Sequence, residues 1–189
     1  MKKIIIGTIV GTVIFFLYQS AMWMGGFHNN LSIYSSVQDS VLKQMNDLHF
    51  TEGVYFIPSA DPAAKDYQKE MQEKMKTSVG KPWAMVFYHS SMKDVETPYI
   101  LMGLLYTFIS ILIAVTVLYY AKFGSFTARF LAVMAFGLFT IFQSVLSDMN
   151  WWNYPWNFIK PHVVDLTFGW ALCAVWLAFY VKNKVPKEG

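Results

Sequence analysis

The sequence predicts an all-α membrane protein with four transmembrane helices and a small extracytoplasmic α+β cap between helices 1 and 2. Two observations carry this prediction. Hydrophobic residues make up 55% of the 189 residues and charged residues only 14%, whereas a typical soluble domain has about 25% charged residues. The hydrophobic residues are also concentrated in four long runs, a pattern that is typical of membrane spans.

The four runs set the predicted domain organisation. Residues 1–24 form the first span, residues 25–97 form the cap, and residues 98–189 contain the other three spans. Those three spans are expected at about 98–121, 128–148 and 161–182. Each run is close to the length of about 20 helical residues that crosses a hydrocarbon core. We expect the first run to remain as an anchor, because no clean small-residue cleavage site follows it.

Positive charge predicts the orientation of these spans. Lysine or arginine lies at the N-terminus, in the turn between spans two and three, and at the C-terminus. These residues are Lys2, Lys3, Lys122, Arg129, Lys182, Lys184 and Lys187. With four spans all three groups fall on one side, which the positive-inside rule makes cytoplasmic. We therefore expect a multi-pass protein of the bacterial inner (cytoplasmic) membrane, with both termini cytoplasmic and residues 25–97 outside.

Short signals mark the ends and the contacts of the spans. Pro98 and Pro161 are expected at the first helical positions of spans two and four. A hydroxyl of Ser125 or Thr127 is expected to start span three. The short connection before it predicts that spans two and three are antiparallel neighbours. In the first span, Gly7-x-x-x-Gly11 is a small-residue pair that permits close helix packing.

The cap is predicted as helix, strand, helix and strand. These elements are expected at residues 31–48, 53–58, 60–77 and 83–89. The first helix carries an apolar stripe at Ile33, Val37, Val41, Leu42, Met45 and Leu48. A unit of this size has a marginal core by itself. We therefore expect it to pack against the membrane surface or the spans.

An aromatic cluster falls at the predicted outer boundary between spans three and four. It contains Trp151, Trp152, Tyr154 and Trp156. Indole and phenol rings favour the membrane–water interface, because one end is apolar and the other forms hydrogen bonds. We interpret the cluster as an interfacial belt. The alternative is a stacking pocket for a lipid, a quinone or a porphyrin.

Three titratable residues form the candidate polar or metal cluster. Asp148 is expected in the last turn of span three, and His162 and Asp165 share one face near the start of span four. Ionisable groups in spans are candidate functional groups, and these three could bind a metal or relay a proton if they converge. The structural alternative is that the helix dipole favours Asp165 and that Lys160 pairs with Asp148. In span three, Gln143 and Ser144 are expected to form interhelical hydrogen bonds.

Several function classes lack their signals. No phosphate-binding loop, dinucleotide fingerprint, nucleophile elbow or H-E-x-x-H motif occurs in the sequence. His28, His49 and His89 have no recognised metal spacing. The net charge of +3 without a basic stripe argues against nucleic acid as a partner, and the single cysteine, Cys173, excludes a disulfide within the chain. The sequence does not identify a cofactor, which stays unknown, and it favours a protein that is not an enzyme.

Three short stretches carry a resemblance. They are Gly53-Val54-Tyr55-Phe56-Ile57-Pro58, Trp83–Tyr88 and Trp151–Pro155. With these stretches the chain resembles an uncharacterised group of four-span bacterial inner-membrane proteins that have a Gly-x-Tyr-Phe-x-Pro-like outer loop and a Trp-rich bend. The chain departs from that pattern at Gly80-Lys81-Pro82, where a lysine interrupts the turn. The resemblance implies the four-span architecture and no activity.

These observations predict a non-enzymatic accessory or interaction subunit of a membrane complex. Its expected partners are the lipid bilayer and other membrane subunits. One alternative is a component that binds or transports a lipid or small molecule. The other is a membrane metal-site protein or enzyme that uses Asp148, His162 and Asp165.

Overall fold

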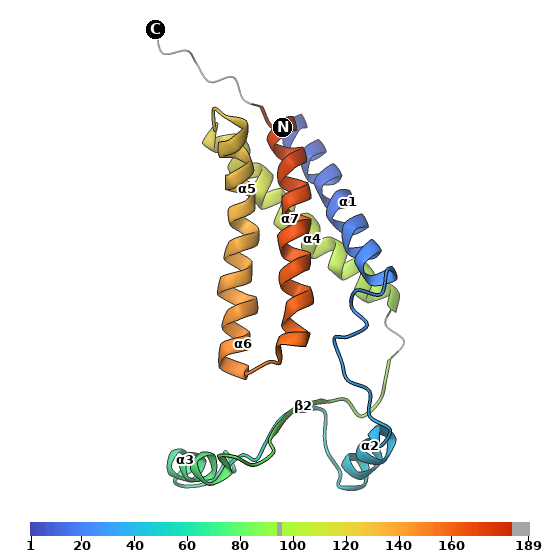
Figure 1. The fold of residues 1–189 in the computed structure, drawn as a ribbon, viewed down its shortest axis with the longest axis vertical. Helices are drawn as coiled ribbons and strands as arrows, with labels where there is room; N and C mark the ends of the chain where they lie inside the picture. Colours follow the sequence, from blue (N-terminus) through green and yellow to red (C-terminus); the bar gives the residue numbers. More distant parts are fainter. Residues whose placement is uncertain (94–95, 183–189) are drawn as a thin grey trace. The chain divides into compact units, whose positions relative to one another are not determined.

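The computed structural model describes residues 1–93 and 96–182. The chain divides into two compact units (Figure 1). The helical unit contains residues 1–33 and 95–189, and the inserted unit contains residues 34–94. Lys184 and Lys187, two of the charges used to predict the orientation, lie outside the described residues.

The helical unit contains four helices that are long and apolar enough to cross a membrane. Their bounds are α1 Lys2–Met24, α4 Glu96–Ala121, the continuous helix Phe126–Trp152, and α7 Trp156–Tyr180. The continuous helix consists of α5 (Phe126–Thr140), a π-helical segment η1 (Ile141–Leu146) and α6 (Ser147–Trp152). The prediction of four span-length apolar helices is therefore confirmed, and their number and length fit a multi-pass membrane protein.

Two predicted boundaries were wrong. The fourth helix begins at Trp156, because Pro155 in an extended conformation precedes it, and Pro161 lies inside the helix. The third helix continues past residue 148 to Trp152 and ends at Asn153, which has a left-handed backbone (φ 53°) that asparagine tolerates. Its beginning agrees with the prediction, since the Ser125 hydroxyl accepts a hydrogen bond from the Ala128 N–H at 3.0 Å.

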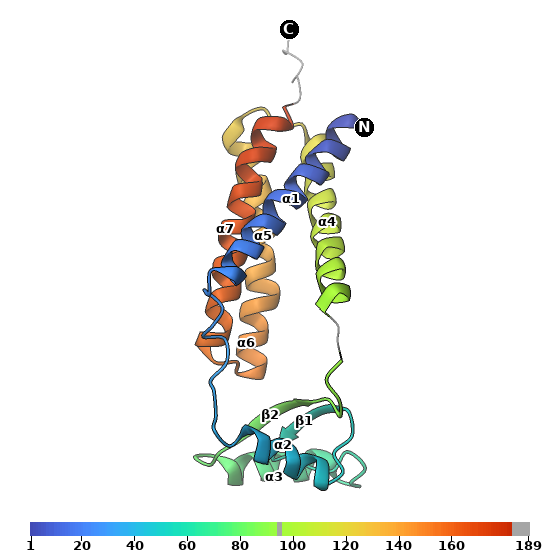
Figure 2. The same cartoon turned by 90° about the vertical axis from the view of Figure 1, so that its right-hand side faces the viewer.

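Small residues allow α1 to cross α4 closely (Figure 2). A Cβ atom at Gly11 would lie 2.8 Å from Cγ2 of Ile111, and one at Gly7 would lie 3.2 Å from Cγ1 of Val115. The close packing predicted for the glycine pair is therefore present. Beyond this crossing the two helices diverge toward the end of α1 and the beginning of α4.

Glycines also bring α1 and α5 onto α7. Gly137 of α5 faces the side chain of Trp170, and Gly169 faces the ring of Phe15 from α1. Trp170 is 5% exposed, and its ring centroid lies 5.9 Å from that of Phe15 and 6.1 Å from that of Phe136. The second and third spans, α4 and α5, were predicted to be antiparallel neighbours. They are in contact, but α5 packs mainly against α7.

A buried arginine fixes one end of this unit. The Arg129 Nε donates to the carbonyl of Ala178 at 2.8 Å, and Nη1 donates to the carbonyl of Phe123 at 2.9 Å. These carbonyls lie in the last turn of α7 and in the connection after α4, where helix geometry leaves carbonyl groups without intrahelical partners. The guanidinium group therefore links α5, α7 and the turn between α4 and α5.

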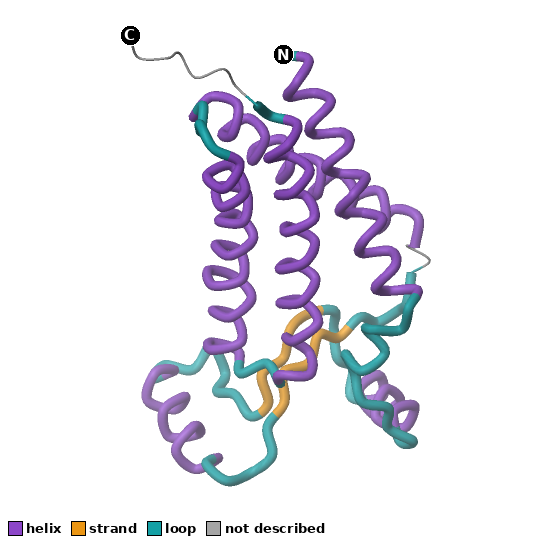
Figure 3. The backbone as a smooth tube through the Cα atoms, turned by 45° about the horizontal axis from the view of Figure 1, so that its top comes forward, coloured by secondary structure: helices purple, strands orange, loops and turns teal. Residues whose placement is uncertain are grey.

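The inserted unit contains the predicted order of helix, strand, helix and strand. Its elements are α2 Gln38–Asp47, β1 Gly53–Ile57, α3 Tyr67–Ser78 and β2 Ala84–Tyr88. The strands pair in antiparallel register from Gly53 opposite Tyr88 to Ile57 opposite Ala84 (Figure 3). Both helices are shorter than predicted. Before α2, the carbonyl and hydroxyl oxygens of Ser35 accept hydrogen bonds from the N–H groups of Gln38 and Val37 and form a turn. Before α3, Oδ1 of Asp61 accepts a hydrogen bond from the Ala63 N–H in a similar turn.

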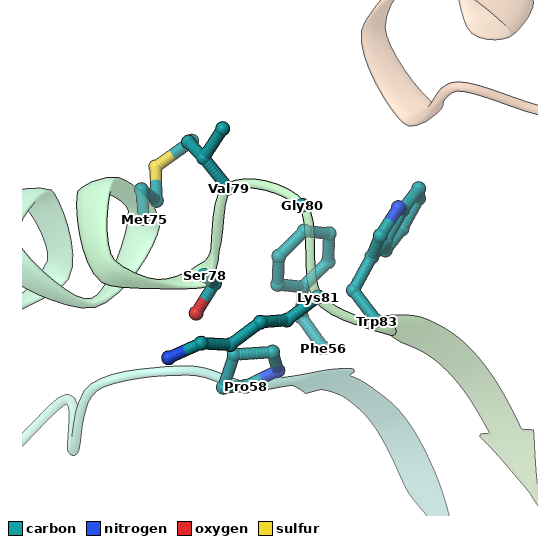
Figure 4. A pocket seen from close by; sticks show the side chains of 8 residues that line it. All are labelled: Phe56, Pro58, Met75, Ser78, Val79, Gly80, Lys81 and Trp83. Atoms are coloured by element: carbon teal, nitrogen blue, oxygen red, sulfur yellow. The ribbon is translucent and has the colours of Figure 1, made fainter.

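The inserted unit has a sparse core. Among its described residues, Ala60 and Tyr88 are the buried hydrophobic ones, and neither α2 nor α3 contains a buried residue. The predicted apolar stripe is largely exposed, including Val41, Leu42 and Leu48. The inserted unit by itself therefore leaves this stripe uncovered. A hollow in this unit, of about 380 Å³, is lined instead by residues of β1, the end of α3 and the segment before β2 (Figure 4).

A glycine substitution tests the helix crossing. We expect Gly11→Ala to lower the free energy of unfolding by about 1–3 kcal/mol, because the new methyl group overlaps Ile111. Gly103→Ala is the control, since nothing lies within 4 Å of a Cβ atom there. Unfolding of both purified variants in detergent measures the difference. Equal stabilities would contradict a tight crossing at Gly11.

An exposed pair in the inserted unit gives a pH test. The Oε1 of Glu52 lies 2.9 Å from Nδ1 of His89, and this hydrogen bond, with the charges of His89 and Lys93, lowers the pKa of Glu52. A lowered carboxyl pKa means that the pairing persists above the unfolded pKa and is lost as pH falls through the folded pKa. We expect His89→Ala to raise the pKa of Glu52 in a carboxyl-carbon NMR titration, and His49→Ala to leave it unchanged.

Candidate functional site

The three predicted titratable residues have different environments. Asp165 is buried in α7, His162 is half-buried three residues earlier on the same face, and Asp148 is exposed in α6. His162 lies close enough to Asp165 for an electrostatic interaction. Within residues 1–93 and 96–182, no three His, Cys, Asp or Glu side chains have metal-binding geometry. The structure therefore groups His162 with Asp165 and leaves Asp148 apart, without the expected ion pair to Lys160 in the described chain.

Asp165 pairs with His28, a residue to which the sequence analysis assigned no function. Nε2 of His28 lies 2.8 Å from Oδ2 of Asp165, and the two residues are 5% and 6% exposed. His28 follows α1, and 137 positions separate it from Asp165. No local spacing in the sequence relates two residues so far apart, so sequence reasoning missed the pair.

Aromatic rings enclose the imidazole of His28. The Trp23 ring stacks on it at a centroid distance of 4.3 Å with 7° between the planes, and Phe27 meets it edge-on at 5.7 Å. Tyr18 and His162 also lie close enough to Asp165 to interact with it electrostatically. Nδ1 of His28 and Oδ1 of Asp165 have no hydrogen-bond partner among the described residues. The pair thus joins the segment after α1 to α7 in a largely apolar environment.

A groove lies between the four helices. Its volume is about 190 Å³, and its lining contains both polar and apolar side chains from α1, α4, α5 and α7. These are Phe15, Gln19, Tyr106, Thr107, Ser110, Ile111, Thr140, Leu166 and Trp170. Ser110, Thr140 and Trp170 lie close to the middle of their respective helices. Most of the groove is therefore at mid-depth of a membrane that the four helices would cross, whereas Gln19, five residues before the end of α1 at Met24, lies nearer one surface.

Polar groups in the groove differ in their hydrogen bonding. The Ser110 and Thr140 hydroxyls each donate at 2.9 Å to the carbonyl four residues earlier in their own helix. In contrast, the side chains of Gln19, Tyr106 and Thr107 form no hydrogen bond within the part of the chain that the structure describes. An unpaired polar group in hydrocarbon is costly. The groove therefore offers hydrogen-bonding groups that the chain itself does not satisfy.

Most residues of the aromatic cluster lie at the ends of α6 and α7 and not in the connection between them. Trp151 and Trp152 end α6, Trp156 begins α7, and only Tyr154 of the predicted four lies between the helices. The three tryptophans are exposed, and their interpretation as a belt stays a prediction. Gln143 and Ser144, predicted to bond across helices, are exposed in the π-helical segment and form no side-chain hydrogen bond among the described residues.

Comparison with known proteins does not assign the chain to a family. No family model matches the sequence, no curated protein matches it, and no solved structure matches its fold. The resemblance to a group of four-span bacterial proteins therefore stays a prediction.

The His28–Asp165 pair makes a measurable prediction. We expect His28→Ala and Asp165→Ala each to lower the free energy of unfolding by about 3–5 kcal/mol, because each leaves a buried partner unpaired. The double variant should lose less than the sum of the two single losses. Asp148→Ala is the control, with an expected change within about 0.5 kcal/mol at an exposed residue. Denaturant unfolding in detergent measures all four, and additive losses would show that the two residues are independent.

Proposed function

We propose that the chain is a non-enzymatic accessory subunit of a membrane complex, with the N-terminal half of α4 as its contact for another membrane subunit. One observation carries the proposal. Between Thr97 and Ser110, every residue of α4 is exposed except Leu104 and Thr107, which are partly covered. Its C-terminal half instead buries Ile111, Ala114, Val115 and Leu118.

This half of α4 differs from an ordinary lipid-facing surface. A helix in a bundle normally buries one stripe along its length and exposes the others to lipid. Here the buried stripe stops at Ile111, although small and hydroxyl residues continue it at Gly103, Thr107 and Ser110. Nothing lies within 4 Å of a Cβ atom built at Gly103. Small and hydroxyl side chains favour contact between membrane helices, so a helix of another subunit fits this stripe.

The proposal includes a location and an orientation in the membrane. We place the protein in a bacterial inner membrane, with its termini in the cytoplasm and the inserted unit outside, because its positive charges favour that orientation. The exposed apolar stripe of α2 supports an inserted unit that completes its packing on another surface. The metal-site alternative has less support, since Asp148 is apart from His162 and Asp165.

A bulky residue at Gly103 tests the contact. We expect tagged wild-type chain, extracted from its own host in mild detergent, to retain a partner chain in native mass spectrometry. Gly103→Leu should lower partner occupancy about tenfold, which corresponds to about 1.4 kcal/mol, because it blocks close helix approach. It should leave the stability of the isolated chain unchanged.

Ala135→Leu is the matched control, because it adds bulk at an exposed small residue of α5 outside the proposed contact. This variant should retain the partner. Wild-type chain without any partner, or Gly103→Leu chain with full partner occupancy, would contradict the proposal.

A further inference from the structure

We propose that the groove at mid-depth binds a neutral, membrane-dissolved ring compound that carries carbonyl or hydroxyl oxygens, of the quinone or phenol class. The site is formed by residues of this chain alone. Its polar lining comes from Gln19 on α1 and from Tyr106 and Thr107 on α4, and the buried rings of Phe15 and Trp170 also line it. The groove shares Thr107 and Ser110 with the stripe of α4 that we propose as the contact for another subunit, so a ligand would enter it in the chain without that partner.

The depth of the groove selects the ligand class. Hydrogen-bonding groups near the middle of a bilayer meet lipid tails, which contain no donors or acceptors, and phospholipid headgroups remain at the interface. A polar ring on an apolar tail, in contrast, can bring its oxygens to mid-depth. The unpaired amide of Gln19 and the hydroxyls of Tyr106 and Thr107 then obtain partners.

The chemistry of the lining favours a neutral flat molecule. No charged side chain lines the groove, so an ionic ligand would enter hydrocarbon without a counter-charge, which is costly. The rings of Phe15, Tyr106 and Trp170 offer apolar and aromatic faces for stacking. The volume of about 190 Å³ suits a single ring and excludes a macrocycle of porphyrin size.

The divergence of α1 and α4 explains the entrance. Phe15 packs between α1 and α7 against Gly169 and Trp170, immediately beyond the tight contact of Gly11 with Ile111. On α4, Tyr106 and Ser110 border the groove and are exposed. A ligand dissolved in the bilayer therefore reaches the groove from the side, past the uncovered half of α4.

The test uses the purified full-length chain in lipid nanodiscs and a 1,4-benzoquinone with a decyl tail as the probe. Quenching of tryptophan fluorescence reports binding, with Trp170 in the groove wall. We expect Gln19→Leu to weaken binding about five- to tenfold, which is the effect of losing one hydrogen bond to the ligand. Gln143→Leu is the matched control, because it makes the same change at an exposed span residue outside the groove.

Two further measurements complete the test. Ser110→Phe places a ring in the groove and should abolish the saturable part of the quenching. Decylbenzene, which has the tail and a ring but no oxygen, should relieve the quenching only at concentrations at least fivefold above that of the quinone. Thermal unfolding confirms that each variant is folded.

Three results would overturn the inference. Superimposable quenching curves for wild type, Gln19→Leu and Gln143→Leu would show partitioning into lipid without a site. Equal competition by decylbenzene would show that the oxygens are not recognised. A phospholipid that stays bound in native mass spectrometry, and that excess quinone does not displace, would assign the groove to a structural lipid.

Discussion

The close crossing of α1 with α4 and α7 is the constraint on which the arrangement of the helical unit depends. Gly7 and Gly11 let α1 approach α4, while Gly169 accepts the ring of Phe15 on α7. The Cys173 thiol also donates to the carbonyl of Gly11 at 3.3 Å, which is possible only when the two backbones lie close together. Because this contact is tight at one place and large side chains follow it, the helices diverge beyond it. The uncovered half of α4 and the groove are both consequences of that divergence.

Polar interactions fix the parts of the unit that apolar packing does not specify. Arg129 donates to the Ala178 carbonyl at the end of α7, and the His28–Asp165 pair links the segment after α1 to the beginning of α7. Each interaction is buried, so its directional hydrogen bonds are strong relative to those made in water. Dispersion and apolar burial tolerate sliding of one helix along another, whereas these bonds require one register. They therefore hold α7 as the helix against which α1 and α5 are positioned.

The order of the helices and strands was predictable from the sequence, but most contacts between them were not. Four apolar runs, the Ser125 cap and the glycine pair are local signals, and each was found from composition or spacing. The beginning of α7 was misjudged because Pro155 and Pro161 both satisfy the helix-start rule, and the sequence does not show which one has the extended backbone. The π-helical segment has no distinct sequence signal. Asp165 was identified as a candidate, but its partner His28 was not, since their contact exists only after α1 has packed on α7.

The polar residues of the span helices have consequences that depend on depth. Near helix ends, water and interfacial groups satisfy exposed side chains such as Asp148, so their presence needs no further partner. At mid-depth the surroundings provide no such partner, and Ser110 and Thr140 satisfy themselves through their own helices. Thr107 does not, and neither does Gln19, which lies nearer the end of α1; both line the same groove. If a membrane-dissolved ring compound binds the groove as we propose, its oxygens give these two side chains the hydrogen-bond partners that their own helices do not supply.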